Sequence, residues 1–489
     1  MTDSSGAPGR NAYAGQVRLY DTRARAVVPI LPSRTGALSI YACGPTVYRD
    51  AHVGNMRTFL LTDLIRRTAE LSGLAVTVVQ NITDVGHMAD DTGLDDGSID
   101  EGQGSGEDKV LKQAAAEGRT ALDIAREYEA RFHRDLSALN VYPATYYPRA
   151  SESIDLMIEL IATLMDRDHA YVGGDGSVFF DARSFAGYGE LSGNRLDDLR
   201  PGHRFAGEVD PAKRFHADWA LWKRAQGTRT QLVWETPWGV GFPGWHTECS
   251  AMSLSLLGAD IDVHTGGIDL RFPHHEDERA QSNCATGTDV VRHWVHGEHL
   301  LFEGRKMSKS AGNVVLVGDV VARGLDPLAL RLAFLQHRYR QQMNLTWDGL
   351  AAADATLARW RQRVAGWATE PSAPLPEAAH RVVNALADDL DTPRGITTLR
   401  QLERDPDVRA GAKFEAFAYL DRALGLDLVR DVGRPTVAEP VPDAVSALLA
   451  ERLQARAARD WAGSDRLRDQ LAALGYPVVD TPEGQQVQR

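Results

Sequence analysis

The chain has 489 residues, of which 43% are hydrophobic, and a formal net charge of −13. This length allows about three domains with buried cores, and no apolar run approaches the roughly 20 residues that cross a bilayer. Residues 1–15 are read as a disordered lead, because the polar N-terminus lacks the basic and apolar regions of a signal peptide. We therefore expect a cytoplasmic protein without a membrane anchor.

Much of the negative charge is local. Eight acidic residues and no lysine or arginine occur between Asp90 and Asp108. We interpret 89–108 as a flexible acidic loop rather than a calcium site, because the 12-residue pattern of calcium ligands is not met. Net acidity disfavours nucleic-acid binding without excluding it, since an acidic protein can still carry basic stripes.

The first half of the chain has the pattern of a parallel α/β sheet. Residues 38–43 predict a strand that passes through Gly44 into a helix over 55–71. The β-branched stretch 75–83 predicts a second strand, parallel to the first. Doubly wound sheets bind ligands beyond the carboxyl ends of their strands, so residues 43–52 are expected at a binding edge.

The middle of the chain interrupts this sheet with an inserted subdomain. Helical patterns cover 109–139 and 151–166, and residues 171–181 and 231–238 predict short strands. The sheet then resumes with predicted strands at 261–264 and 290–296. Asp326 and Pro327 open a helix with a cap and a first-turn proline, further helices reach about residue 428, and a proline-rich linker precedes a last small unit.

The turn His52-Val-Gly-Asn55 joins the first predicted strand to its helix, which is the geometry of a nucleotide site. A helix start presents backbone N–H groups at the positive end of a macrodipole, where polyanions bind. Far downstream, Lys306 and Lys309 lie in a loop flanked by glycines. Two ammonium groups there could move onto charge that develops at a phosphorus atom.

Five sequence blocks resemble a known family. The His-Val-Gly-Asn turn and Lys306-Met-Ser-Lys-Ser310 resemble the two signature motifs of class I aminoacyl-tRNA synthetases. The blocks 43–48, 244–252 and 272–276 resemble cysteinyl-tRNA synthetases in particular. One short block means little, whereas the ordered set is specific, and the resemblance runs from about Leu38 to the C-terminus.

The resemblance implies an α/β fold: a doubly wound, Rossmann-type parallel-sheet catalytic domain with an inserted connective subdomain, followed by an all-α helical bundle and a small C-terminal domain. The expected divisions are the first catalytic half (16–140), the connective insertion (141–241), the second half with the metal and the lysine motif (242–310), a linking stem (311–350), the tRNA-binding bundle (351–430), a linker (431–443) and an anticodon-binding unit (444–489).

A second group of residues has the composition of a zinc site. Cys43 and Cys249 supply thiols, and Glu278 lies four residues after His274, so the two would share a helix face. Spacing alone leaves His275 an equal candidate. The resemblance places one zinc ion on Cys43, Cys249, His274 and Glu278. Zinc would favour the deprotonated thiol of cysteine over a serine hydroxyl, so no editing domain is needed.

The resemblance also assigns the other site residues. Catalytic roles fall on His52, Asn55, Lys306 and Lys309. ATP, with Mg²⁺, would contact His52, Gly54, Asn55, Gly267, Asp269, Trp294 and Lys309. The substrate cysteine would contact Gly44, Thr46, Trp245 and His264. Both tryptophans are equally well read as core aromatics, and Cys284 as a buried small apolar residue.

The predicted reaction is ATP-dependent ligation of L-cysteine to tRNA(Cys) through a cysteinyl-adenylate. A rival is the cysteine ligase of mycothiol biosynthesis, a shortened relative that passes cysteine to an amino sugar. The C-terminal stretch favours tRNA, with expected contacts at Arg456, Asp460, Trp461, Arg468 and Asp480. A non-catalytic paralogue ranks last, because the main motif residues are present. We expect a monomer, since no coiled-coil heptads occur.

Two departures from the family pattern stand out. Thr83-Asp84 is followed by Val85-Gly86-His87 where the family usually has Ile-Asp-Asp-Lys, and the tryptophan expected near the C-terminus is absent from 484–487. These departures affect the edge of the pocket and the anticodon contacts.

Overall fold

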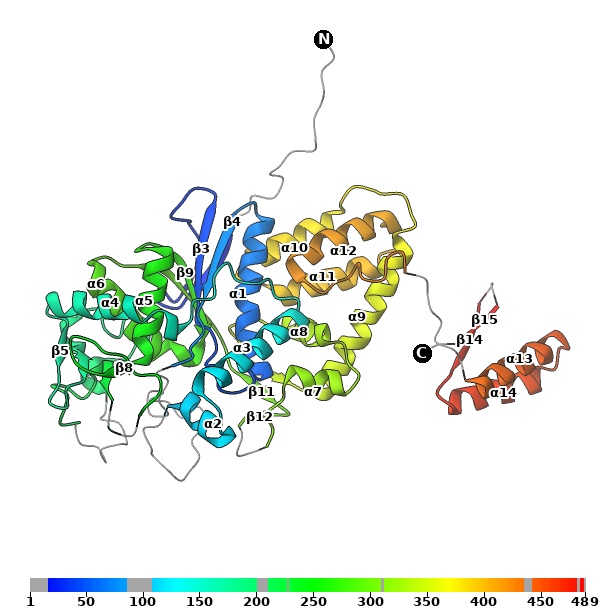
Figure 1. The fold of residues 1–489 in the computed structure, drawn as a ribbon. Coiled ribbons are helices and arrows are strands. Elements are labelled where there is room, and N and C mark those ends of the chain that lie inside the picture. Colours follow the sequence, from blue (N-terminus) through cyan, green and yellow to red (C-terminus); the bar gives the residue numbers. More distant parts are fainter. Residues whose placement is uncertain are drawn as a thin grey trace, which may run out of the picture. The chain divides into compact units, whose positions relative to one another are not determined.

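The computed structural model describes residues 16–85, 108–199, 210–225, 227, 229–308, 312–434, 442–481 and 484–487. The chain divides into two compact units, Met1–Val432 and Gly433–Arg489, and each is described by itself (Figure 1). No helix within the described ranges combines the length and the apolar character that a membrane crossing requires.

A four-stranded parallel sheet lies at the centre of the first unit. Its order is β10–β9–β3–β4. The strands are β3 (Ala37–Ala42), β4 (Ala75–Gln80), β9 (Ile261–Gly267) and β10 (Val291–Gly297). The sheet grows from β3 to one side with β4 and to the other side with β9. The topological switch point therefore lies between β3 and β9, and the predicted parallel pairing of the first two strands is confirmed.

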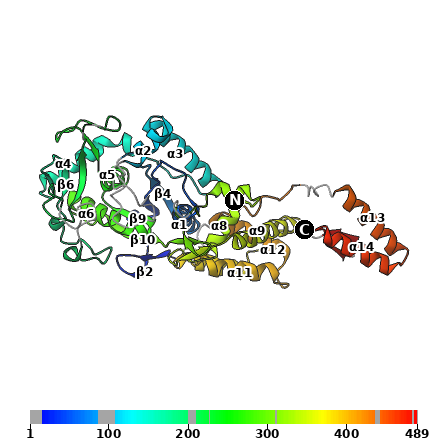
Figure 2. The same ribbon diagram turned by 90° about the horizontal axis from the view of Figure 1, so that it is seen from below.

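Helices cover both faces of this sheet. Helix α1 (Val53–Leu71) packs on one face, and α5 (Trp245–Leu257) contacts β3 and β4 on the other (Figures 1 and 2). Behind α5 lie α4 (Ile154–Asp166) and α6 (His274–Thr286). Most of α1 is buried, including Met56, Leu60 and Ile65, because it is enclosed between the sheet and the helical bundle. The helix predicted from residue 55 begins two residues earlier.

A hairpin and two helices, α2 (Lys109–Glu117) and α3 (Ala121–Ala138), accompany the parallel sheet in the first unit. β1 (Arg18–Asp21) and β2 (Ala26–Pro29) form the hairpin, and β1 lies beside β10. The helical stretch predicted over 109–139 is two helices, α2 and α3. The break falls at Gly118, whose φ of 64° ends α2 in the left-handed conformation. Short 3₁₀ helices span Ala150–Glu152, Ala182–Ser184, Leu196–Asp198 and Ile268–Arg271.

The insertion forms an antiparallel sheet in the order β5–β6–β7–β8. Its strands are β5 (Ala170–Val172), β6 (Val178–Phe180), β7 (Trp219–Arg224) and β8 (Gly241–Pro243). The strand predicted over 231–238 is wrong: the segment makes one bridge, from Trp234 to Gly241, and Leu232 turns the backbone at a φ of 52°. Its place in the sheet is taken by β7, which buries Trp219 and Trp222.

The chain leaves the sheet through an arm and enters a helical bundle. The arm pairs β11 (Leu300–Phe302) with β12 (Arg305–Lys306) and β13 (Met343–Leu345). Two helices lie between β12 and β13, α7 (Val317–Ala322) and α8 (Pro327–Leu335). The helices after β13 are α9 (Trp347–Trp367), α10 (Glu377–Ala387), α11 (Thr392–Arg404) and α12 (Ala410–Leu424). The predicted cap at Asp326 is confirmed, since its side chain accepts from the Leu328 N–H.

The second unit is small. It contains α13 (Asp443–Ala457), α14 (Trp461–Ala473) and the hairpin of β14 (Val478–Thr481) and β15 (Gly484–Val487). Val445, Leu471 and Val478 form its core.

Candidate active site

Several of the predicted site residues lie at or near the carboxyl edge of the sheet, at its switch point. Cys43 directly follows β3, and its N–H donates to the Thr265 carbonyl of β9 at 3.2 Å. Gly266 and Gly267 end β9. Open α/β sheets bind ligands at such an edge, beyond the carboxyl ends of their strands.

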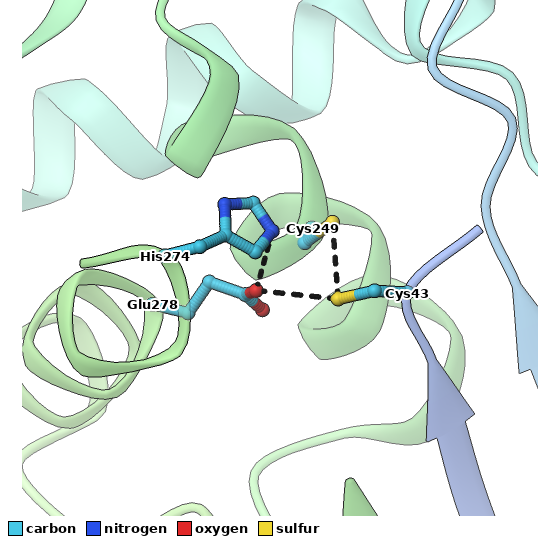
Figure 3. Close-up of side chains that lie close together, drawn as sticks. All are labelled: Cys43, Cys249, His274 and Glu278. Carbon is cyan, nitrogen blue, oxygen red and sulfur yellow. Dashed lines mark hydrogen bonds and ion pairs between the residues drawn. The ribbon is translucent and has the colours of Figure 1, made fainter. Parts of the chain in front are cut away.

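Four side chains from three elements converge beside this edge (Figure 3). Cys43 comes from the end of β3, Cys249 from α5, and His274 and Glu278 from successive turns of α6. Their potential ligand atoms all lie within 4.8 Å of one another, and all four residues are buried. The Cys43 sulfur is 4.0 Å from the Cys249 sulfur and 3.5 Å from Glu278 Oε1, which is 2.9 Å from His274 Nε2.

The donor set fits a zinc ion. Two thiols, one imidazole and one carboxylate are the ligand types that zinc prefers, in the number that fills a tetrahedral site. Burying four titratable side chains together is costly unless they are paired or coordinate a metal, so packing alone does not explain their convergence. The prediction that His274 and Glu278 lie on the same face of a helix is confirmed.

Ionisation in this group already favours a thiolate. Burial alone would raise the pKa of the Cys249 thiol, but the hydrogen bond from Cys43 and the adjacent His274 lower this pKa below its usual range. Burial alone would lower the pKa of His274, but Glu278 and Cys249 raise it to about 10. A thiolate is the form of cysteine that binds a metal, and the proton on His274 would be displaced as the metal enters.

His275 belongs to a second, overlapping group. Its Nε2 lies 3.2 Å from the Cys43 sulfur, and His264, Cys43 and Glu278 complete a set of four close donors. His275 Nδ1 is 2.8 Å from His296 Nε2, which links it to Thr22. Of the two candidates that spacing left equal, only His274 shares its group with both cysteines.

A second row of side chains orients His274. His246 Nδ1 lies 2.9 Å from His274 Nδ1, and Asp277 lies 3.6 Å from the other nitrogen of His246. Tyr188 donates to Asp277 at 2.6 Å. Sequence reasoning did not single out His246, Asp277 or Tyr188 for this task. The adjacency of His246 and Asp277 to predicted ligands was a signal, but it could not show that they face the same ring.

Aromatic rings wall the site. Trp245 stacks on His274 with ring centroids 4.1 Å apart, and Trp294 stacks on His264 at 4.5 Å. Both tryptophans are buried, so each meets the histidines and also serves as core. Thr46 bridges to Thr83 across the strand ends, and Asp269 follows Gly267 in a 3₁₀ turn.

Close packing restricts the first turn after β3. A Cβ added to Gly44 would lie 1.6 Å from the Asn81 carbonyl oxygen. The Gly44 N–H also donates to the Asn81 side chain at 2.8 Å. Gly44 therefore allows the chain that carries Cys43 to lie directly against the end of β4.

The phosphate end of the site begins at His52, the N-cap of α1. His52 Nδ1 accepts from the Asn55 N–H, and Asn55 Oδ1 accepts from the His52 N–H, both at 3.1 Å. The Val53 N–H donates to Val315 at 2.9 Å. Because His52 Nδ1 accepts a hydrogen bond, the proton of the neutral His52 ring lies on Nε2. Because these backbone donors are occupied, recognition of an anion here shifts towards side-chain donors.

The lysine motif is adjacent to this turn. Met307 is buried, and its methyl carbon lies 3.0 Å from the Cβ position of Gly54. Asn313 closes the base of the loop by accepting from the Ser308 N–H at 2.8 Å and donating to the Lys306 carbonyl at 3.0 Å. Lys306 is exposed. Lys309 lies outside the described residues, as do Gly86, His87 and nearly all of the acidic loop.

In the second unit the predicted tRNA contacts divide into two kinds. The Asp480 carboxylate is held by Arg452 at 2.9 Å and by Arg456 at 2.7 Å, and Asp460 caps α14. Trp461 is 58% exposed, and the exposed Arg468 pairs with Asp465 at 3.2 Å. Asp480 therefore orients an arginine pair, whereas Trp461 presents an aromatic face.

Comparison with known proteins decides the family. The family described as "tRNA synthetases class I (C) catalytic domain" matches residues 29–92 and 105–355, and "Cysteinyl-tRNA ligase anticodon binding domain" matches residues 439–487. The chain belongs to the cysteine–tRNA ligase family. The cysteine–tRNA ligase 1 of Burkholderia lata is 42% identical over 96% of both chains. A cysteine–tRNA ligase of Thermus thermophilus is 41% identical over 95% of this chain and 98% of its own.

Solved structures share the fold of the family at low sequence identity. Methionyl-tRNA synthetase of Mycobacterium tuberculosis with methionyl-adenylate covers 80% of this chain and 92% of its own, with a TM-score of 0.54 at 15% identity. A LeuRS–tRNA–LeuAMS complex of Agrobacterium radiobacter covers 81% of this chain and 84% of its own, with a TM-score of 0.57 at 11% identity. The predicted α/β class I architecture is confirmed.

Proposed function

We propose that this protein activates L-cysteine with ATP and transfers the cysteinyl group to tRNA(Cys). The observation that carries the proposal is the buried group of Cys43, Cys249, His274 and Glu278, since Cys43 lies on the same connection between β3 and α1 as the His52 turn. A thiol selector and a phosphate site then share one edge of the sheet. Membership of the cysteine–tRNA ligase family supports both parts.

The four buried residues would hold one zinc ion. Zinc bound there would supply a Lewis acid that favours a deprotonated thiol over a hydroxyl, which remains protonated near neutral pH. Gly44 follows Cys43, Trp245 stacks on His274, and His264 lies 3.4 Å from the Cys43 sulfur. These three residues and Thr46 are proposed to orient the cysteine, with the stacked rings excluding water.

Adenylate formation needs positioning more than covalent chemistry. The cysteine carboxylate attacks the α-phosphorus of ATP and pyrophosphate leaves, with Mg²⁺ accompanying the nucleotide. His52 would donate to the phosphates through Nε2, and Asn55 fixes the ring of His52 through the reciprocal cap. Lys306 and Lys309 would neutralise the charge that develops on the phosphates. Gly54, Gly267, Asp269 and Trp294 are the further residues proposed to bind ATP.

The metal-binding group is tested with Cys249→Ser, and Cys284→Ser is its matched control. Cys284 is also buried, but it lies in a different core cluster, and burial raises the pKa of its thiol to about 12. We expect Cys249→Ser to lose zinc, measured by elemental analysis, and cysteine-dependent ATP–pyrophosphate exchange, whereas Cys284→Ser retains both. Undiminished exchange in Cys249→Ser would refute the proposal.

The lysine loop is tested with Lys309→Ala. This variant should bind cysteine normally and form the adenylate slowly, because it loses charge at the phosphates and leaves the thiol site intact. Single-turnover adenylate formation measures the rate. A normal rate would remove Lys309 from the mechanism.

The acceptor is proposed to be tRNA rather than an amino sugar. The match of residues 439–487 to a cysteinyl-tRNA ligase anticodon-binding domain supports this choice. Arg456, Asp460, Trp461, Arg468 and Asp480 are the proposed contacts. Parallel charging assays with tRNA(Cys) and with glucosaminyl inositol test it, and transfer to the amino sugar alone would overturn it. We further propose a monomer, to be checked by light scattering.

A further inference from the structure

Arg57 is a buried arginine close to the nucleotide end of the site. It lies on α1 two residues after Asn55 and is 7% exposed. Its guanidinium donates to four backbone carbonyls: Glu298 at 2.7 Å, His299 at 3.0 Å, Arg338 at 2.9 Å and Gln341 at 2.7 Å. Burial lowers the pKa of Arg57 to about 10, so the side chain remains a cation at neutral pH. The residue therefore ties the start of α1 to two other chain segments.

The first of these segments leads to the lysine motif. Residues 298–299 lie between β10 and β11, and β11 pairs with β12, which ends at Lys306. The position of the 298–299 turn thus sets where the arm begins. The chain after β12 contacts the same helix again. Met307 packs against Gly54, and the Val53 N–H donates to the Val315 carbonyl.

The second segment, 338–341, lies between α8 and β13 and is held by the bundle. Arg338 pairs with Asp391 at 2.6 Å, and the Asp389 carboxylate accepts from the Tyr339 hydroxyl and from Arg340, both at 2.6 Å. The Glu298 N–H donates to the Tyr339 carbonyl at 2.8 Å. Both segments bonded by Arg57 are therefore also bonded to each other.

The turn that holds segment 338–341 is strained. Asp389 and Leu390 have φ values of 58° and 48°, so two successive residues with side chains adopt the left-handed conformation. Such a conformation is strained and persists only where the surroundings over-determine it. Here the surroundings are the buried Leu390 side chain and the three partners of Asp389, which include the Tyr20 N–H at 2.9 Å.

We propose that Arg57 is a positioning residue for adenylate formation. Its bonds to residues 298–299 and 338–341 are called the lock, and the Asp389–Leu390 turn connects them to the helical bundle. Arg57 fixes the separation between the His52 turn and the arm that carries Lys306. Catalysis by positioning is sensitive to such a separation, since a misplacement of about 1 Å can lower a rate on the order of 100-fold. The inference rests on the proposed function, in which ATP lies between these two elements.

Lysine cannot replace arginine in this lock. A guanidinium presents five donors in a planar fork, whereas an ammonium presents three donors around one point. Four carbonyls on two segments match the fork. Arg57→Lys therefore retains the charge and loses the bridge, which makes it the informative variant.

The test compares Arg57→Lys with Arg361→Lys. Arg361 is also buried on a helix, but it bonds neither residues 298–299 nor 338–341. It donates to the carbonyls of Asp427 at 3.0 Å and Leu426 at 2.8 Å and to the Asp326 carboxylate at 2.7 Å. We expect Arg57→Lys to lower kcat for cysteine-dependent pyrophosphate exchange at least tenfold, with zinc content and the KM for cysteine within twofold of wild type. Arg361→Lys should lower the melting temperature and change kcat less than twofold.

Each outcome decides between a positioning role and a general structural role. An unchanged kcat in Arg57→Lys, or an equal loss in Arg361→Lys, would overturn the lock. If Arg57→Lys does not fold, Asp389→Asn decides, because asparagine tolerates the left-handed conformation but loses the carboxylate. It should lower kcat about threefold or more, and no change would overturn the lock. Failure of the wild type itself to exchange pyrophosphate would instead refute the proposed function.

Discussion

Gly44→Ala tests the packing that places Cys43 in the site. The added Cβ would lie 1.6 Å from the Asn81 carbonyl oxygen, and real Cβ contacts shorter than 3.0 Å essentially never occur, so the two segments must separate by about 1.4 Å. The obstacle is backbone at the end of β4, which cannot rotate away. Cys43 is the preceding residue, so a shift of its segment also displaces its sulfur.

The expected result is a large loss of activity with a moderate loss of stability. A displacement of about 1 Å lowers rates on the order of 100-fold, and overpacking costs about 1–3 kcal/mol. Zinc content, pyrophosphate exchange and the melting temperature measure the three effects. Gly318→Ala is the control, because a Cβ on this glycine of helix α7 meets nothing within 4 Å. Wild-type exchange in Gly44→Ala would refute the reasoning.

Three further predictions concern the bundle, the catalytic region and the second unit. Arg331 is fully buried and donates to Asp63 at 2.6 Å and to three backbone carbonyls. Arg331→Met should therefore lower the free energy of unfolding, measured by urea titration, by about 3 kcal/mol. A loss below about 1 kcal/mol would contradict this prediction. Burial and Asp50 raise the pKa of Asp135 to about 6, so the folded state loses stability as pH rises from about 4 to about 6. At pH 7.5 the free energy of unfolding of Asp135→Asn should exceed that of wild type by about 1 kcal/mol, after solvent screening is allowed for. At pH 4 the two proteins should be equally stable. Equal melting temperatures at both pH values would contradict this prediction. Trp461→Ala should raise the KM for tRNA about tenfold by removing a stacking face, and leave pyrophosphate exchange unchanged; an unaltered KM would exclude the contact.

The sequence alone determined the elements that have strong local signals. The β-branched run before Gln80, the proline after Asp326 and the pairing of His274 with Glu278 at one helical turn each predicted the structure found. Local signals failed at 231–238, where an apolar-looking run is a turn. They failed because the backbone turns at Leu232, with a φ of 52°, and the strand that pairs with β6 is β7, which buries Trp219 and Trp222.

The motif blocks also fixed which residue types the site contains, since thiol, imidazole and carboxylate are recognisable one at a time. Spacing could not choose between His274 and His275, because neighbouring helical positions differ only in the direction they face. The packing of α6 against α5 made that choice, by turning His274 towards both cysteines.

The contacts that join the His52 turn to the strand of Lys306 are visible only in the folded structure. His52 and Lys306 are more than 250 residues apart in sequence, and their relation depends on Arg57, on the turn after β10 and on a strained turn in the bundle. None of these has a local signature, because a buried arginine that bonds backbone carbonyls leaves no pattern in its partners' side chains. Motifs record the chemistry of a residue, whereas the separation between these motifs depends on a side chain that bonds backbone carbonyls, and residues of any type can supply such carbonyls.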